Sequence, residues 1–371
     1  MSPEVESTFF ALLRAGLWEK DIQVGSISLP TYESLTRLAL EQCVMGLIAA
    51  GLEHVQDVKV PDKVLSYYHT RLAKMEDGNQ MMNFFINLLE EQMRDADISA
   101  VLLKGQGLAQ CYERPLWRVV GDIDFLLYAD NYEKAKLLIT PMATKCEKER
   151  VLDKHYGVYI KPWNIELHGT LHAGLSPSID RLLDSIQNRI FAEKRFRLWQ
   201  NEDVAIKLPC ADDDVIYVFA HILQHFYRGG VGLKQVCDWC RLLWFYRDEI
   251  DINLLHSRLR SMRLESEWRA FAAFAVEYLG MPQDAMPLYD NNLSWKKKAG
   301  RIKTFLLKVG NFGQKRLPGQ KDKAYIVRKI LSFGQRIGDL YRHAFIFPLD
   351  SVRFLPAIVF NSLRSAAHGE G

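Results

Sequence analysis

The chain has 371 residues, of which 48% are hydrophobic and 25% charged, and its formal net charge is +3. This length is enough for two or three domains with separate cores, and the composition is that of a globular protein. No run approaches the roughly 20 apolar residues that span a bilayer, and acidic residues replace the basic start of a secretory signal peptide. Because six cysteines form no dense framework, we predict a cytoplasmic protein without a transmembrane segment.

The charge is distributed unevenly. From Trp295 onward there are 16 Lys/Arg and 4 Asp/Glu, whereas the first 294 residues carry 32 and 41. This basic tail favours an anionic partner: nucleic acid, an acidic polymer, or a membrane that Phe354, Leu355 and Ile358 would contact. The alternatives are a solvated face or packing against the acidic remainder. Packing is favoured by an apolar stripe of Tyr325, Ile326, Ile330, Leu331 and Phe333.

Residues 1–95 are predicted to form an N-terminal helical region. Apolar residues recur at spacings of three and four, most clearly over residues 34–55 and 81–96. This spacing places them on one face of a helix. We expect the region to act as a structural layer.

Residues 96–208 are predicted to form a small α/β core. Strands are expected over 99–105 and 122–128, and a hairpin over 156–169 with its turn at Lys161-Pro162. Short helices are expected over 107–112 and over 130–139, the second with Asp130 as its N-cap. Strand, helix, strand, helix and hairpin in this order predict a small mixed sheet. Residues 171–208 show no clear pattern.

Residues 209–371 are predicted to be a helical domain that ends in the basic tail segment. The helical pattern resumes at residue 211, where Asp212, Asp213 and Asp214 are candidates for its N-cap. Prolines at 282 and 287, followed by residues 290–292, indicate a linker before a basic helical segment over 294–342. The predicted fold class is therefore α+β, with a small mixed-sheet core between N-terminal and C-terminal helical regions.

Two carboxylates at the start of the second strand suggest a metal site. Asp122 and Asp124 point to the same face of the strand, with Cα atoms about 7 Å apart. Glu166, in another alternating strand, can supply a third carboxylate beside them. Clustered carboxylates repel each other unless a cation lies between them. Mg²⁺, or Mn²⁺ in its place, is bound in this way by carboxylates together with substrate phosphates.

The turn before this strand has the residues of a phosphate site. Lys104 and Gly105 end the first strand, and Gln106 begins a short helix. A glycine at such a turn lets backbone N–H groups approach an anion, and the lysine adds a charge. We therefore expect Lys104, Gly105 and Gln106 to bind the phosphates of a nucleotide.

The order of these motifs resembles the polymerase-β-like nucleotidyltransferase superfamily. The resemblance rests on a strand with Lys-Gly-x, a helix, an arginine, Gly-Asp-Ile-Asp and then Ile-Glu-Leu-His. It is strongest to a bacterial branch of uncharacterised nucleotidyltransferases, and more distant to AbiEii-type abortive-infection toxins. It implies that Asp122, Asp124 and Glu166 are the catalytic, metal-binding acids. Gly105-Gln106 matches the Gly-Gly or Gly-Ser pair of the superfamily only in its first member. Arg118 matches an arginine of the branch, and the resemblance implies that it binds the phosphates of the NTP.

A second stretch, "HILQHFYRGGVGLKQVCDW" over residues 221–239, resembles the helical-domain signature of the same branch. It implies supporting roles for His221 and Asp238. Lys234 follows a glycine-rich break where a starting helix could direct it at a triphosphate, although a solvated surface position is equally compatible. Asp238 could instead cap or pair within its own helix.

Several histidines and cysteines have structural interpretations that we favour. His168 is expected to hydrogen-bond Glu166 rather than to bind metal, and a strand pattern argues against a zinc helix with His172. His221 and His225 have helical spacing but lack a third ligand nearby, so a packed or hydrogen-bonded pair is favoured. A single Cys-x-x-Cys at 237–240 is expected to be two inert core thiols.

The predicted function is transfer of a nucleoside monophosphate from an NTP to an acceptor hydroxyl, with release of pyrophosphate. The resemblance implies ATP as the nucleotide. The acceptor is left open as a small molecule, saccharide, protein or RNA. The alternatives are a catalytically degenerate nucleotide-binding or regulatory module, and a toxin-like enzyme that modifies tRNA. Asp-x-Asp also occurs in glycosyltransferases that bind sugar nucleotides, and as polar residues at strand edges.

Overall fold

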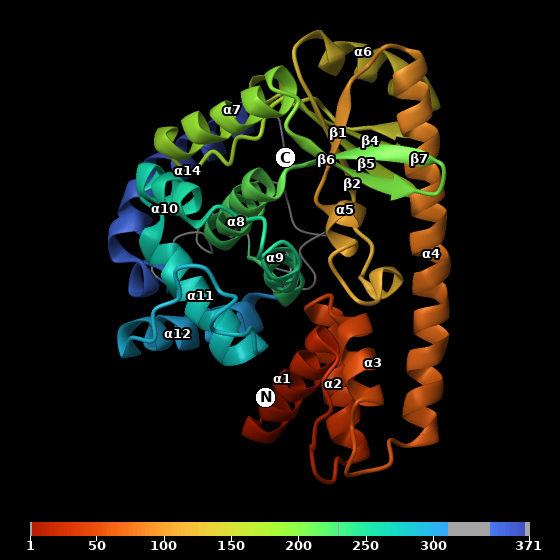
Figure 1. Cartoon of the computed structure of the whole chain (residues 1–371), viewed down its shortest axis with the longest axis vertical. Helices are drawn as coiled ribbons and strands as arrows, with labels where there is room; N and C mark the ends of the chain where they lie inside the picture. Colours follow the sequence, from red (N-terminus) through yellow and green to blue (C-terminus); the bar gives the residue numbers. More distant parts are fainter. Residues whose placement is uncertain (1, 229, 311–341, 368–371) are drawn as a thin grey trace.

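A computed structural model describes residues 2–228, 230–310 and 342–367. Its fold is α+β, as predicted, with one five-stranded mixed sheet and a separate two-stranded sheet (Figure 1). Helical regions precede and follow the sheets along the chain. No helix in the described ranges is long and apolar enough to cross a membrane. Short 3-10 turns occur at Pro115–Trp117, Thr140–Met142 and Val151–Asp153.

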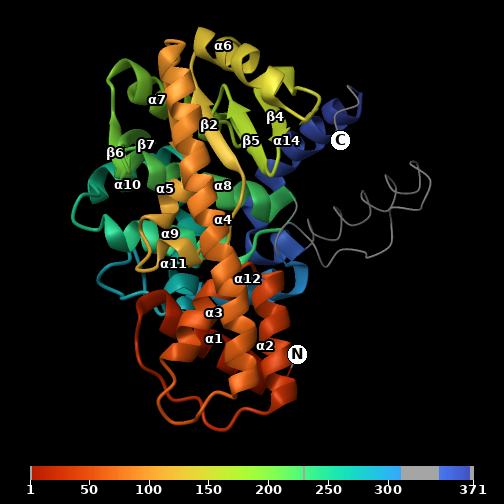
Figure 2. The same cartoon turned by 90° about the vertical axis from the view of Figure 1, so that its right-hand side faces the viewer.

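The N-terminal region is helical, as predicted, and contains α1 (Pro3–Trp18), α2 (Leu29–Glu41), α3 (Met45–Glu53) and α4 (Asp62–Asp95). The periodic run over 34–55 is divided between α2 and α3, because Cys43 adopts a positive φ of 55° that a helix does not tolerate. The 34-residue α4 extends from the N-terminal helices to the sheet along one side of the molecule (Figures 1 and 2).

The five-stranded sheet has the order β1-β2-β5-β4-β3. β2 pairs in parallel with β5, and the other pairs are antiparallel. The predicted hairpin is therefore confirmed as β4 and β5. The strands are β1 (Ala100–Leu103), β2 (Ile123–Leu127), β3 (Lys145–Cys146), β4 (His155–Ile160) and β5 (Trp163–His168), with α5 (Gly105–Ala109) and α6 (Asp130–Ile139) between them.

The two faces of this sheet differ because side chains alternate along each strand. On β2, Ile123, Phe125 and Leu127 are fully buried in a core shared with α4 and α6. The intervening Leu126 packs in the larger core with the N-terminal and C-terminal helices. The second face therefore turns its remaining side chains, including Asp124, toward the helical part of the protein.

Two local expectations were wrong by one or two residues. α5 begins at Gly105 rather than at residue 107, and Asp130 is the first residue of α6, whose N-cap is Ala129. The segment without a clear pattern forms a helix and the two-stranded sheet: α7 (Pro177–Ala192), β6 (Phe196–Asn201) and β7 (Val204–Pro209).

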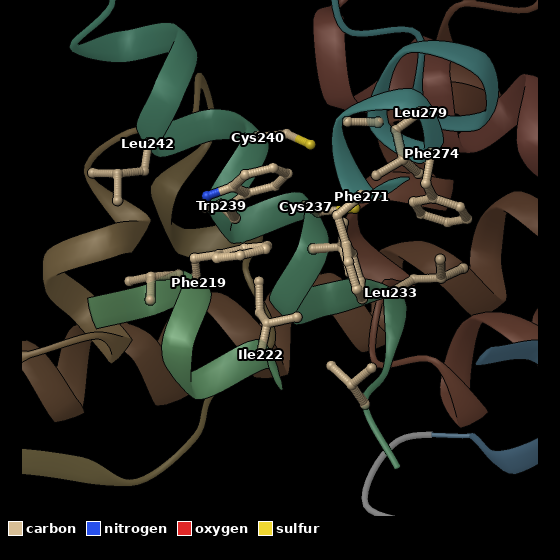
Figure 3. Packing of buried hydrophobic residues seen from close by; sticks show 14 of the residues in the cluster. Phe219, Ile222, Leu233, Cys237, Trp239, Cys240, Leu242, Phe271, Phe274 and Leu279 are labelled. Atoms are coloured by element: carbon tan, nitrogen blue, oxygen red, sulfur yellow. The ribbon is translucent and has the colours of Figure 1, made fainter. Parts of the chain in front are cut away.

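The C-terminal region contains α8 (Ala211–Arg228), α9 (Leu233–Phe245), α10 (Ile252–Met262), α11 (Glu265–Leu279), α12 (Leu293–Val309) and α14 (Pro348–Ala367). Its core is aromatic: Phe219 stacks on Trp239 with ring centroids 5.2 Å apart (Figure 3). Both rings also contact Trp268. Cys237 and Cys240 are buried free thiols in this core, as expected, and burial raises the pKa of both.

The aspartates at the start of α8 do not cap it, contrary to the prediction. They lie in its first turn, and two of them are buried in ion pairs with arginines of other elements. Asp213 accepts a hydrogen bond from Arg258 at 2.6 Å, and Asp214 accepts two from Arg197 at 2.9 and 3.0 Å. Their role is to join α8 to α10 and β6.

The described part of the basic tail packs on the protein. Lys296 pairs with Glu277 at 3.0 Å, Lys303 pairs with Glu6, and the apolar face of α12 is buried. Phe354, which the membrane alternative would place in lipid, is fully buried against Tyr227 instead. These contacts favour packing over an anionic partner. The apolar stripe predicted between residues 325 and 333 lies outside the described residues.

Candidate active site

Three neighbouring strands form a polar patch on the sheet face that meets the C-terminal helices. Asp124 of β2 lies opposite Glu166 of β5, and His168 of β5 lies opposite His155 of β4. Each of these residues alternates with an apolar residue of the opposite face. Strand register therefore brings four ionisable side chains together, two of them the predicted acids.

Asp124 is held by two basic side chains. Its Oδ1 lies 3.1 Å from Lys104 Nζ and 2.9 Å from His168 Nε2, and the residue is only 5% exposed. Burial alone would raise the pKa of Asp124, but Lys104 and His168 outweigh it and hold the pKa below its usual value. In return, burial opposes the charge of Lys104, yet Asp124, Tyr217 and Glu166 raise its pKa. The positive charge expected opposite the acids is thus supplied in part by Lys104, which directly follows β1.

Glu166 is flanked by two imidazoles. His155 Nε2 lies 3.0 Å and His168 Nε2 3.4 Å from Glu166 Oε2. Burial would raise the pKa of Glu166, but hydrogen bonds and charge from His155 and His168 lower it well below the usual range. The expected contact between His168 and Glu166 is present, and the shorter hydrogen bond of His168 is to Asp124.

The sequence reasoning missed His155. The register of the hairpin could have revealed this residue. A turn at Lys161-Pro162 pairs Ile160 with Trp163, and five residues further from the turn on each strand it pairs His155 with His168. A cross-strand pair on one face has Cβ atoms only about 5 Å apart. Counting from the turn would have placed His155 in the site.

Asp122 lies at the exposed rim of the same patch, directly before β2. Asn164 Nδ2 donates to its Oδ1 at 3.3 Å. Partial burial and the negative charges of Glu166 and Asp124 raise its pKa. The three predicted acids therefore interact electrostatically. Within the described residues, Asp122 Oδ2, Asp124 Oδ2 and Glu166 Oε1 accept no hydrogen bond.

Helix α8 covers the patch with Tyr217, His221 and His225. Lys104 Nζ lies 5.8 Å from the centre of the Tyr217 ring, which in turn contacts His221. The Nε2 atoms of His221 and His225 are 3.0 Å apart, so the hydrogen-bonded pair that we expected is present. Burial and then Lys104 lower the pKa of His221 far below its usual value and that of His225 to about 4. Both imidazoles are therefore neutral at neutral pH.

Lys234 stands at the start of α9, where the glycine-rich break predicted a helix start. A methyl group added at Gly121 would lie 3.3 Å from its Nζ, which places the ammonium beside the residue before Asp122. No acceptor within the described parts of the chain contacts this Nζ. Burial, and then the charge of Arg118, lower the pKa of Lys234 to about 8.

Arg118, which we predicted as a phosphate ligand, is engaged by a carboxylate of the protein itself. Its Nε and Nη2 donate to Asp238 Oδ1 and Oδ2 at 2.7 and 2.8 Å, a bidentate pair that is almost fully buried. Tyr112 donates to the same carboxylate at 2.8 Å. Asp238 therefore pairs with a distant segment rather than within its own helix, and its role is to fix the loop before β2. Of the guanidinium nitrogens of Arg118, Nη1 is the one without a hydrogen-bond partner among the described residues.

The glycine turn has the expected backbone, but its glutamine turns away from the patch. Gly105 has a positive φ of 45°, and an added Cβ would lie 3.3 Å from the Asp122 carbonyl oxygen. Gln106 is buried and donates to Asn83 Oδ1 of α4 at 2.6 Å. The side chain of Gln106 therefore makes a structural contact, and the place of Gln106 among the phosphate ligands stays a prediction that rests on the backbone of the turn.

Gln106 belongs to a row of contacts along α4 that the sequence reasoning also missed. Asn79 donates to the carbonyl oxygens of Leu116 and Arg118 at 2.8 and 2.9 Å. One and two helical turns later, Asn83 accepts from Gln106, and Asn87 exchanges hydrogen bonds with Asn201. Asparagines spaced by four residues lie on one helix face, and that spacing was the available signal.

The fold and this patch define a class of α+β protein in which a mixed sheet presents carboxylates, imidazoles and a lysine beneath a helical cover. The sequence assigns the protein to a family within this class. Residues 30–280 match the family of uncharacterised nucleotidyltransferases, and because the match covers most of the chain, the protein belongs to this family. No curated protein and no solved structure matches the chain. The similarity to AbiEii-type toxins stays a prediction.

Proposed function

We propose that the protein transfers a nucleoside monophosphate from an NTP to an acceptor hydroxyl. The acceptor oxygen forms a bond to the α-phosphorus, the bond from that phosphorus to pyrophosphate breaks, and the hydroxyl proton passes to solvent. Family membership supports the transfer. The observation that carries the site is the meeting of Asp122, Asp124 and Glu166 on one sheet face, each with one oxygen that accepts no hydrogen bond within the described chain.

These three acids fit Mg²⁺ or Mn²⁺. Carboxylate oxygens are the ligands that both ions accept. Partial burial, together with the negative charges of Glu166 and Asp124, raises the pKa of Asp122. Bound there, the ion would neutralise phosphate charge and orient the reacting oxygens.

The protein's own side chains divide the remaining work. Lys104 and His168 hold Asp124 in place, and Lys234 supplies a cation for the triphosphate beside Asp122. Glu166 is a poor proton acceptor because its pKa is held low, so we assign it to ligation rather than to deprotonation of the acceptor. ATP is the donor that we propose, from the superfamily resemblance. The acceptor is a hydroxyl of a small molecule, saccharide, protein or RNA.

The direct test is incubation of the purified protein with each α-labelled NTP and cell extract. We expect label to appear on one class of acceptor, only when a divalent ion is present. Label that binds reversibly but is never transferred would favour the degenerate nucleotide-binding alternative. Label on tRNA would favour the toxin-like one.

Glu166→Gln should leave nucleotide bound but lower the transfer rate by roughly 10²–10³-fold, the scale seen when one group that stabilises transition-state charge is removed. Two acids remain to hold a cation, whereas the charge that fixes its position is lost. Single-turnover transfer and equilibrium NTP binding separate these effects. Transfer at the unaltered rate would remove Glu166 from the site.

Lys234 predicts a pH dependence of nucleotide binding. With a pKa of about 8, Lys234 is cationic below that pH and neutral above it, so NTP affinity should fall as pH rises beyond 8. Lys234→Ala should weaken binding by about 10–100-fold near pH 7, which corresponds to one hydrogen bond to a charged group. Calorimetric titration from pH 6.5 to 9.5 measures both effects.

Two further variants serve as controls for Lys234. Lys234→Arg keeps its charge at all these pH values and should flatten the profile. Lys297→Ala, on the exposed face of α12, should change nothing. Wild-type affinity that is constant across pH 8 would contradict the placement of Lys234 at the phosphates.

A further inference from the structure

His155 has no part in the proposed transfer, yet it is built into the centre of the patch. It is 9% exposed, and its imidazole makes an edge contact with that of His168 at a centroid distance of 4.8 Å. Apolar side chains would fill this position at less cost than a buried imidazole. The placement of His155 therefore calls for a ligand-binding explanation.

We propose that His155, Glu166 and His168 form a binding site for a transition-metal ion of the zinc type. This site shares Glu166 with the set of three carboxylates that fits Mg²⁺, but its other two ligands are imidazoles, which select a different class of metal. It is the one group of three or more His, Cys, Asp or Glu side chains, among the residues that the structure describes, whose ligand atoms lie within 4.8 Å of one another.

The separations of the ligand atoms fit a single small cation. Two atoms bound tetrahedrally at 2.0–2.1 Å from Zn²⁺ are about 3.3 Å apart. Glu166 Oε2 lies 3.0 Å from His155 Nε2 and 3.4 Å from His168 Nε2. The ligand nitrogens of His155 and His168 lie within 4.8 Å of each other, so the two rings would have to adjust when these hydrogen bonds are exchanged for metal bonds.

The kind of ligand selects the kind of metal. Imidazole nitrogen suits Zn²⁺ and its neighbours among the first-row transition metals, whereas Mg²⁺ prefers oxygen ligands and keeps its water. Two histidines and one carboxylate are also the ligand count of zinc sites that keep one position open for water or substrate. Asp124 is hydrogen-bonded to His168 Nε2, the nitrogen that would bind the metal, so on metal binding Asp124 would lose this contact and keep Lys104 as its partner.

The backbone holds the three ligands in a rigid arrangement. His155 and His168 are a register pair of the β4–β5 hairpin, and Glu166 is the diagonal neighbour of His155 on the same face. Sites on paired strands keep their geometry better than sites on loops. The site is therefore preformed, and binding requires little ordering of the chain.

The test uses Co²⁺ as a spectroscopic probe of the full-length protein after removal of metal with a chelator. Co²⁺ bound to imidazole and carboxylate absorbs visible light. We expect one equivalent to bind per chain, and Zn²⁺ but not a large excess of Mg²⁺ to displace it. His155→Gln keeps a donor for Glu166 but loses the imidazole, and it should weaken Co²⁺ binding by at least about 100-fold.

Matched variants make the result decisive. His172→Gln is the control, because His172 pairs with Asp184 at 2.7 Å outside the patch, and it should bind Co²⁺ normally. His168→Gln replaces His155→Gln if circular dichroism shows that the latter is unfolded. Unchanged Co²⁺ binding in both patch variants, or displacement by Mg²⁺ as effective as by Zn²⁺, would overturn the proposal. The readout does not depend on nucleotidyl transfer, so a negative transfer assay leaves it standing.

Discussion

Asp122→Asn should abolish metal-dependent nucleotide binding without lowering the thermal stability of the metal-free protein. Asp122 lies at the exposed rim of the patch, where partial burial of its carboxylate and the charges of Glu166 and Asp124 raise its pKa. An acid whose pKa is raised by folding costs stability once the pH rises above its unfolded value. The neutral amide removes this cost at neutral pH, so the melting temperature should stay constant or rise. Calorimetric NTP titration with and without Mg²⁺ measures the loss of binding.

Asp124→Asn is the contrasting variant. Asp124 is buried against Lys104 and His168, so its loss should remove nucleotide binding and stability together. Asp184→Asn, in a surface pair with His172, should affect neither. A lower melting temperature in Asp122→Asn, equal to that in Asp124→Asn, would mean that Asp122 is a structural residue. Nucleotide binding that persists in Asp122→Asn would remove it from the site.

Lys104→Met should lower the free energy of unfolding by about 3 kcal/mol, the scale seen when one partner of a buried ion pair is removed. The substitution keeps the volume of the side chain but leaves Asp124 with His168 as its remaining basic contact. The wild-type pair also predicts the pH dependence: the lowered pKa of Asp124 stabilises the fold above its unfolded pKa, and this is lost as pH falls. Urea unfolding at several pH values measures both.

Two comparisons isolate the pair. Lys59→Met removes a lysine paired with Asp62 at 3.5 Å on the surface, where both side chains are more than 80% exposed, and should cost at most about 1 kcal/mol. In the double variant Lys104→Met and Asp124→Asn, the second substitution should lower the free energy of unfolding by less than it does alone, because neither charge of the pair is then left without its partner. Losses that add fully would show that Lys104 and Asp124 do not stabilise each other.

The sequence alone was sufficient for the parts of the site that depend on alternation along a strand. Asp122, Asp124, Glu166 and His168 could be placed on one face because a strand has a period of two. The mixed sheet followed from the order of strands and helices. The start of α9 at Leu233 followed from the glycine-rich break, and this positioned Lys234.

The sequence did not reveal contacts between distant segments. Arg118 has the charge for phosphate, but only tertiary structure shows that Asp238, 120 residues later, accepts hydrogen bonds from its Nε and Nη2. Gln106 likewise stands at the right turn and is claimed by Asn83 of α4. The residue type in a motif determines which hydrogen bonds a side chain can make. The packing of other helices determines which of these hydrogen bonds form.

The asparagine row of α4 has a consequence for how this protein can change during evolution. Asn79 holds the loop before Asp122, Asn83 holds the turn after Lys104, and Asn87 holds the β6–β7 hairpin. A mutation at any of these positions leaves a buried polar group without a partner unless the facing segment changes too. We therefore expect residue 83 to covary with residue 106, and residue 87 with residue 201, among members of the family. Recombination that exchanged α4 alone would separate these pairs of residues and leave their buried polar groups without partners.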